Sequence, residues 1–134
     1  MPDDKTKYLE LVQAVITRMA SNSFVAKGWS ITLVTALLAL AAKDNNPKFA
    51  AVGILPVFMF WSLDAYYLAL EKRFRDLYEI ARNVPTSSPV SFDLTPVPLT
   101  SGFWFRSLFR PAVVLVHAPL LIVVIVLIVI GSSH

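Results

Sequence analysis

The sequence predicts an all-α integral membrane protein with three transmembrane helices. Hydrophobic residues make up 56% of the 134 residues and charged residues only 16%, whereas a soluble domain has roughly 25% charged residues. So few charges could not cover the surface of a small water-soluble monomer. Three apolar segments, residues 25–43, 49–70 and 112–131, approach or reach the length that a helix needs to cross a bilayer.

Residues 1–24 predict an amphipathic helix before the first span, either cytoplasmic or interfacial. Its apolar residues recur at steps of three and four, the period of one helix face. These residues are Tyr8, Leu9, Val12, Val15, Ile16 and Met19. The polar run from Ser21 to Ser23 is expected to interrupt the helix. The apolar face is expected to lie on the membrane or to pack on a partner.

Residues 25–82 predict a transmembrane hairpin that turns between Asn45 and Asn46. Pro56 lies in the second span and is expected to kink it, because proline removes an amide hydrogen bond. No helix-breaking residue follows Leu70, so the second helix should continue into the cytoplasm over residues 71–82.

The last third of the chain predicts three segments in succession. Residues 83–102 contain several prolines and form a cytoplasmic loop. Residues 103–111 are aromatic and basic, which is typical of an interfacial segment. Residues 112–131 form the third span, in which Pro119 is expected to cause a kink, and its tail of Leu, Ile and Val should face lipid.

The basic residues indicate the orientation in a bacterial inner membrane. Ten of the twelve lysines and arginines lie before or at the start of the first span or between the second and third spans, and two flank the hairpin turn. Cytoplasmic loops carry the excess of basic residues. The N-terminus and the long loop are therefore expected in the cytoplasm, and the C-terminus outside.

Lys27 and Asp64 are the ionisable residues of the hairpin nearest the hydrocarbon, and they lie equally far from the predicted turn. The hairpin should therefore bring them together near the cytoplasmic boundary. Each residue alone would be costly there, and pairing reduces the desolvation cost of both. We favour an anchor that sets the hairpin register. The alternative is a charged constriction in an oligomeric pore, or a proton-linked site.

Two further residue groups are candidates for placement and packing. An interfacial aromatic belt is predicted for Trp29, Trp61, Tyr66, Tyr67 and Trp104. A stripe of small residues on the first span could let another helix approach closely. This small-residue stripe consists of Gly28, Thr32, Thr35, Ala36 and Ala39, continuing to Ala42. Contact with the second span of the same chain is the favoured interpretation, and self-association is the alternative.

Catalytic, cofactor-binding and metal-binding motifs are not found in the sequence. Cysteine is absent, and the four glycines are too far apart to form a phosphate-binding loop. His117 has no second histidine at ligand spacing, because His134 is expected on the opposite side of the membrane. We therefore interpret His117 as a buried or interfacial imidazole with one hydrogen bond. The scattered basic residues do not favour nucleic-acid binding.

Several motifs together resemble a family of small bacterial inner-membrane proteins to which no reaction is assigned. They are Met19–Phe24, Lys27–Trp29, Phe60–Leu68, Glu71, Phe74–Arg75, Leu77–Tyr78 and Phe103–Phe109. In outline the chain is also similar to the SLATT-type two-span effector modules of bacterial defence systems, with a third span added. That resemblance implies assembly into membrane pores.

Three functions remain open on the sequence. The first is a non-enzymatic, oligomeric membrane protein, either a pore-forming effector or an accessory subunit, that responds to a soluble cytoplasmic partner. The second is a small ion or proton channel or transporter in which Asp64 titrates. The third is a small lipid-modifying enzyme, for which the sequence contains no motif.

Overall fold

The computed structural model is all-helical over the part of the chain that it describes, residues 3–44, 46–98 and 100–133. Its helices in chain order are α1 (Asp4–Asp44), α2 (Pro47–Val52), α3 (Ile54–Arg82), α4 (Ser101–Leu108) and α5 (Pro111–Ser132). The predicted all-α class is confirmed. Asn45 in the predicted hairpin turn and the C-terminal His134 lie outside the described residues.

Three helical stretches of the described chain are long and apolar enough to cross a membrane. They are Asp4–Asp44, Lys48–Arg82 and Pro111–Ser132. The three predicted spans fall within these stretches, so the structure supports a multi-pass membrane protein.

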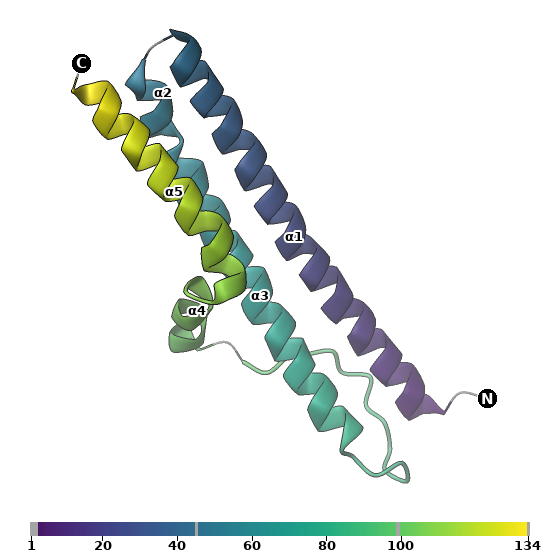
Figure 1. Cartoon of the computed structure of the whole chain (residues 1–134). Coiled ribbons are helices and arrows are strands. Elements are labelled where there is room, and N and C mark those ends of the chain that lie inside the picture. Colours follow the sequence, from purple (N-terminus) through teal and green to yellow (C-terminus); the bar gives the residue numbers. More distant parts are fainter. Residues whose placement is uncertain (1–2, 45, 99, 134) are drawn as a thin grey trace.

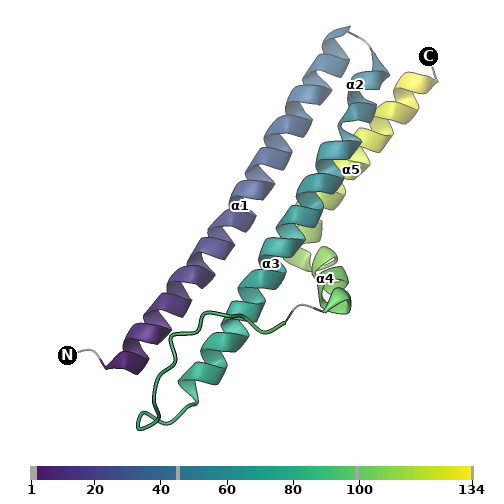
Figure 2. The same ribbon diagram turned by 180° about the vertical axis from the view of Figure 1, so that it is seen from behind.

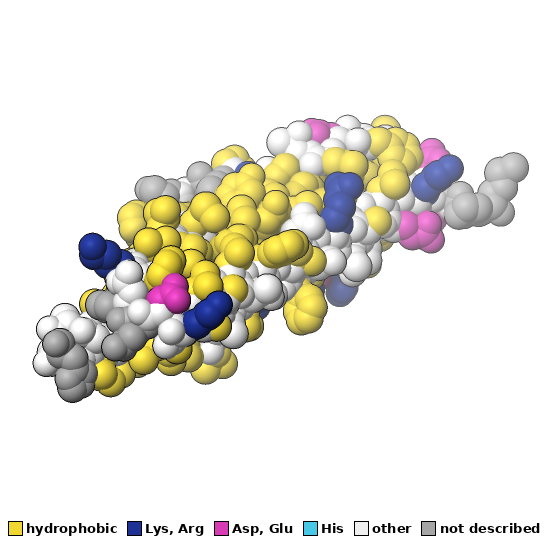
Figure 3. All heavy atoms as spheres, turned by 90° about the horizontal axis from the view of Figure 1, so that it is seen from above, with side chains coloured by type: hydrophobic (Ala, Val, Ile, Leu, Met, Phe, Trp, Pro, Cys, Tyr) yellow, Lys and Arg dark blue, Asp and Glu magenta, His cyan; other side chains and the backbone are white. Residues whose placement is uncertain are grey.

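The molecule is an antiparallel hairpin of α1 and α3 with α5 packed along the half that contains the turn (Figure 1). Figure 2 shows the same arrangement from behind, with the C-terminus near the turn and the N-terminus at the opposite end. We call residues 4–20 and 70–82 the open end of the hairpin. Figure 3 shows a broad apolar surface with charged side chains toward both ends.

The first helix is continuous, and the predicted interruption from Ser21 to Ser23 is wrong. α1 has 41 residues and is about 60 Å long at 1.5 Å per residue. Residues 4–24 therefore form the first half of α1 rather than a separate helix. The low helix propensity of serine and asparagine is a weak effect that tertiary contacts override. Here Ser23 is buried and its hydroxyl donates a hydrogen bond to Asp64.

The apolar face of the N-terminal segment packs on the same chain. Tyr8, Val12 and Ile16 are buried against Phe74 of α3. The buried positions of α1 continue toward the turn at steps of three and four residues, the period of one helix face. These later positions are Ser23, Ala26, Ser30 and Val34.

The predicted small-residue stripe is exposed and lies off the buried face of α1, so its interpretation as the packing surface for the second span is wrong. All of its members are exposed: Gly28, Thr32, Thr35, Ala36, Ala39 and Ala42. Gly28 and Thr32 each follow a buried residue, Ala26 or Ser30, by two positions, which is about 200° around the helix. Close approach of α1 and α3 instead uses small residues on the buried faces. On α3 these are Ala65 and Ala69, which have no exposed surface.

The second predicted span is divided between α2 and α3 at Gly53. Pro56 has no amide hydrogen to donate to the carbonyl of Val52, so the helical ladder is broken at this point. Gly53 donates its N–H to the carbonyl of Ala50 at 3.0 Å. A β-carbon at Gly53 would lie 3.1 Å from that carbonyl oxygen, so the tight break favours glycine. Beyond it, α3 continues past Leu70 to Arg82 as expected.

The half of the bundle near the turn has an apolar core formed by three helices. Val34 of α1, Val57 of α3 and Val124 of α5 have no exposed surface and pack together. α5 continues without interruption through Pro119. Most of its remaining aliphatic side chains are exposed, as expected for a helix that faces lipid.

The predicted loop is a segment without regular secondary structure that passes along the hairpin before α4 (Figure 2). We call residues 83–98 the connecting segment. Tyr8 donates its hydroxyl hydrogen to the carbonyl of Asp93 at 2.5 Å, and Lys5 donates to the carbonyl of Val84 at 2.5 Å. Arg73 donates to the carbonyl of Val97. These bonds hold the segment on the open end.

Candidate functional site

The candidate site is a buried ionic cluster where α1, α3 and α5 meet. Its centre is Asp64, whose side chain has no exposed surface. Lys27 of α1 donates to Asp64 Oδ1 at 2.7 Å, and Ser23 donates to the same oxygen. His117 of α5 bonds Oδ2 at 3.0 Å. One carboxylate therefore connects all three long helices.

The predicted pairing of Lys27 with Asp64 is confirmed. Lys27 lies one helical turn after Ser23 and also donates to its hydroxyl oxygen at 2.9 Å. The lysine side chain is 17% exposed, so its stem is buried while its ammonium reaches Asp64. The hairpin register follows from this contact, because a shift of one helical turn would leave the buried carboxylate without its cation.

His117 also belongs to the ionic cluster, which was not predicted from the sequence. The side chain is fully buried, and its ring stacks on Trp61 with centroids 6.1 Å apart and an interplanar angle of 13°. The expectation of a buried imidazole with one hydrogen bond is correct, but its partner was missed. Residue depth could have indicated it, because His117 lies five residues after the start of the third predicted span and Asp64 lies six residues before the end of the second.

The hydrogen bonds assign the imidazole tautomer. An ionised carboxylate can only accept, so the proton in the contact between His117 and Asp64 lies on Nε2. Nδ1 of a neutral imidazole then carries a lone pair, and it has no hydrogen-bond partner among the described residues. With neutral His117 the cluster has one positive and one negative charge. Burial of such a pair is tolerated because the carboxylate accepts three hydrogen bonds.

This arrangement differs from a hydrolytic triad. A serine nucleophile needs a histidine between its hydroxyl and the carboxylate, whereas here Ser23 and His117 both bond directly to Asp64. The described residues also contain no group of three or more histidine, cysteine or acidic side chains that could hold a metal ion. The interactions that the cluster makes are charge pairing and hydrogen bonding to one carboxylate.

The predicted aromatic belt is divided between the surface and the cluster. Trp29 and Tyr66 are exposed, whereas Tyr67 and Trp104 are half-buried. Trp61 turns inward, where its indole N–H donates to the carbonyl of Leu108 at 2.8 Å. Its ring covers the cluster and its N–H fixes the end of α4, so its role goes beyond interfacial placement.

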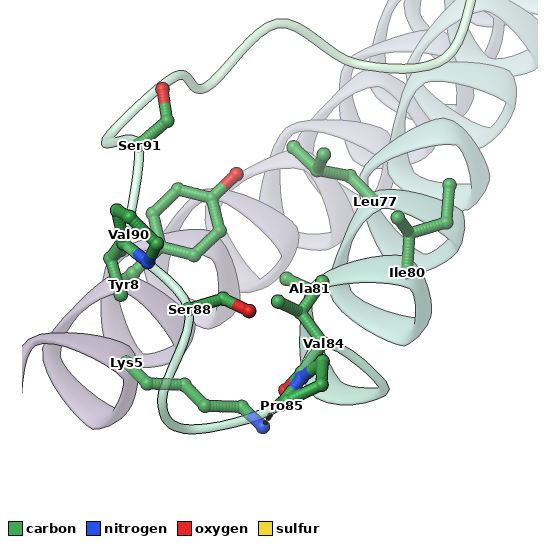
Figure 4. Close-up of a pocket in the computed structure, with 11 residues that line it drawn as sticks. Lys5, Tyr8, Leu77, Ile80, Ala81, Val84, Pro85, Ser88, Val90 and Ser91 are labelled. Atoms are coloured by element: carbon green, nitrogen blue, oxygen red, sulfur yellow. Dashed lines mark hydrogen bonds between the residues drawn. The ribbon is translucent and has the colours of Figure 1, made fainter.

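A second feature is a cavity of about 240 Å³ between the open end and the connecting segment. Figure 4 shows Leu77, Ile80 and Ala81 of α3 on one side and Val90 on the other. Lys5 is the one charged residue among those that line it. The cavity is separate from the ionic cluster, since no residue belongs to both.

Comparisons with protein-family models, with curated proteins and with solved structures found no match to this chain.

Proposed function

We propose that the chain is a non-enzymatic protein of the bacterial inner membrane, with its N-terminus and connecting segment in the cytoplasm and its C-terminus outside. In this placement the N-terminal part of α1 and residues 71–82 of α3 project from the membrane as a cytoplasmic hairpin. The strong excess of basic residues on that side of the ionic cluster supports the orientation.

Its function in this proposal is that of an oligomeric effector pore or an accessory subunit that a soluble cytoplasmic partner controls. One observation carries the proposal: the ionic cluster joins α5 to two helices that run unbroken from the open end into the membrane half. A displacement of α1 relative to α3 at the open end would change the register at Asp64. Loss of that register would release His117 and with it α5.

A pore would have to form between copies of the chain. The interior of one copy is filled, because Val34, Val57 and Val124 pack together with no exposed surface. The exposed small-residue stripe on α1 and the exposed aliphatic face of α5 are available to neighbouring helices. The ionic cluster acts in this scheme as a latch that keeps α5 on its own hairpin.

The partner would bind at the open end, and the cavity beneath the connecting segment indicates its chemistry. The walls are mainly apolar and the one lining charge is the ammonium of Lys5. A soluble protein that presents an apolar side chain next to an acidic residue matches this surface. Its insertion would displace the connecting segment from Tyr8 and Lys5.

Ion flux from vesicles tests the latch. The full chain is reconstituted in liposomes, and potassium and proton release are compared between the wild type and Asp64→Asn. Glu79→Gln is the matched control, since Glu79 is an exposed carboxylate on the same helix. We expect a low flux for the wild type without its partner and an increase of several fold for Asp64→Asn alone.

The mass of the protein in mild detergents provides a second, independent measurement. We expect a species of several copies. A strictly monomeric protein, together with no flux from any variant, would contradict the proposal.

A second candidate function is proton-linked transport, and the contact between His117 and Asp64 favours it. Buried ionisable groups that share a hydrogen bond are the elements of a proton relay, and these two are fully buried and 3.0 Å apart. The same flux experiment separates the two candidates. A transporter loses its proton flux in Asp64→Asn, whereas a latched pore gains flux.

A further inference from the structure

A second pocket lies on the opposite side of α3 from the connecting-segment cavity and has a different character. Its volume is about 330 Å³, and it is formed by α3 and the start of α5. The lining residues are Leu68, Glu71, Lys72, Arg75, Asp76 and Arg110. Five of the six are ionisable, so the pocket is strongly polar.

The charges in this pocket leave an excess of positive charge. Arg75 is already paired with Glu71, at 2.7 Å from Nη2 and 3.1 Å from Nε. Lys72 and Arg110 form no salt bridge with any described residue. The ammonium of Lys72 lies over the Phe103 ring, 5.4 Å from its centroid. Asp76 is the one acid outside the Arg75 pair, so two cations face one carboxylate.

The start of α5 adds to the positive potential. Arg110 is the N-cap residue of this 22-residue helix, and no side chain caps it. The amides of Val113 and Val114 donate to the carbonyl of Arg110, and the dipole of the helix places partial positive charge at this end, which favours anions. The guanidinium of Arg110 and the helix end therefore act in the same place as the ammonium of Lys72.

The position along the helices matches the headgroup layer of a membrane. Glu71 lies seven residues beyond Asp64, which is about 10 Å along α3. Arg110 directly precedes the apolar residues of α5, and Phe103 to Phe105 form an aromatic group nearby. Basic pockets between transmembrane helices on the cytoplasmic side are suited to anionic headgroups.

We propose that Lys72 and Arg110 bind the phosphate group of an anionic phospholipid of the inner leaflet. Arg75 and Glu71 form the floor and hold each other in place, and Leu68 contacts the start of the acyl chains. The bound lipid bridges α3 and α5 next to the ionic cluster. This site is independent of the flux mechanism proposed above, because none of its residues belongs to the cluster.

Lipid-dependent thermal stability tests the site. The full chain is purified in detergent and mixed with phosphatidylglycerol, with phosphatidylcholine or with inorganic phosphate. We expect phosphatidylglycerol to raise the unfolding temperature more than phosphatidylcholine. Lys72→Gln and Arg110→Gln should each weaken apparent lipid affinity roughly fivefold, since a basic residue near anionic lipid contributes about 1 kcal/mol.

Arg106→Gln is the matched control. Arg106 is an exposed basic residue of α4 that does not line the pocket, so the lipid affinity of this variant should equal that of the wild type. If inorganic phosphate alone stabilises the protein and Arg110→Gln abolishes that effect, the site binds phosphate. The ligand would then be a soluble phosphate and not a lipid. Equal responses to the two lipids, or equal losses in Arg106→Gln and Arg110→Gln, would overturn the site.

Discussion

The open end and the middle of the α1–α3 hairpin are packed by different means. At the open end large apolar side chains are buried together, with Tyr8, Val12, Ile16 and Phe74 in contact. Toward the middle they are small or polar, and Asp64 at 0% exposure is surrounded by Ser23, Lys27 and His117. One pair of helices thus changes its packing chemistry along its length.

The difference follows from the solvent that each of these two regions is proposed to meet. In water, burial of large apolar side chains drives two helices together. In lipid the surroundings are as apolar as the side chains, so association depends on close packing of small residues and on interhelical hydrogen bonds. The change in packing along α1 and α3 therefore supports a membrane boundary near Asp64.

Removal of the Asp64 charge should have the largest effect on stability. Asp64→Leu leaves Lys27 without its partner and His117 without its acceptor, and breaking a buried pair costs about 3–5 kcal/mol. The measurement is unfolding in mixed detergent micelles with increasing denaturing detergent. The double variant Lys27→Met with Asp64→Leu should recover much of the loss. Glu79→Gln should change stability by less than about 0.5 kcal/mol.

Enlarging a small residue in the helix interface should have the next largest effect. Ala26→Leu or Ala65→Leu forces α1 and α3 apart, and overpacking costs about 1–3 kcal/mol. Ala36→Leu is the matched control on the exposed stripe and should leave monomer stability unchanged. An equal loss of stability in Ala36→Leu would mean that the stripe is buried. That result would refute the assignment of Ala26, and not Ala36, to the buried face of α1.

At the open end, Tyr8→Phe should have a smaller and local effect. The substitution keeps the ring on Phe74 and Val90 but removes the hydroxyl that donates to the carbonyl of Asp93. Loss of one such bond costs about 1 kcal/mol. Limited proteolysis should show faster cleavage of the connecting segment, while unfolding of the membrane half stays unchanged. Unaltered cleavage would show that this bond does not hold the segment.

The smallest expected effect is a pH dependence of the connecting segment. The side-chain and backbone hydrogen bonds from Thr95 hold the pKa of Asp93 below its usual value. The lowered pKa means that this turn is favoured above the pKa of the unfolded chain and weakens as pH falls through the folded value. Amide hydrogen exchange at residues 93–97 should therefore be less protected at pH 3 than at pH 5, relative to intrinsic rates. Asp93→Asn should remove that difference.

Several features could be predicted from the sequence because they depend on one segment or on simple geometry. The three apolar stretches and the helical period of Tyr8, Val12 and Ile16 are local properties. The contact between Lys27 and Asp64 follows from equal distances to the turn. The sequence also indicates how deep His117 lies in the third span. Its partner could be inferred only by comparing that depth with the depth of Asp64 in the second span.

Other features depend on how the helices are rotated against one another. The small-residue stripe was assigned by residue type, and only the buried positions at Ala26 and Ser30 reveal that it faces away from α3. The continuity of α1 through Ser23 depends on a hydrogen bond from another helix. The break at Gly53 combines the missing amide of Pro56 with close contacts to α1 and α5.

The sequence by itself determined that this protein consists of apolar helices long enough to cross a bilayer, and that Lys27 and Asp64 meet. Helix length and residue spacing are set by the chain alone. The tertiary structure decided which helix faces meet and that His117 completes the ionic cluster. It did so because the rotation of each helix about its axis is chosen by all of its neighbours at once, and no single segment encodes it.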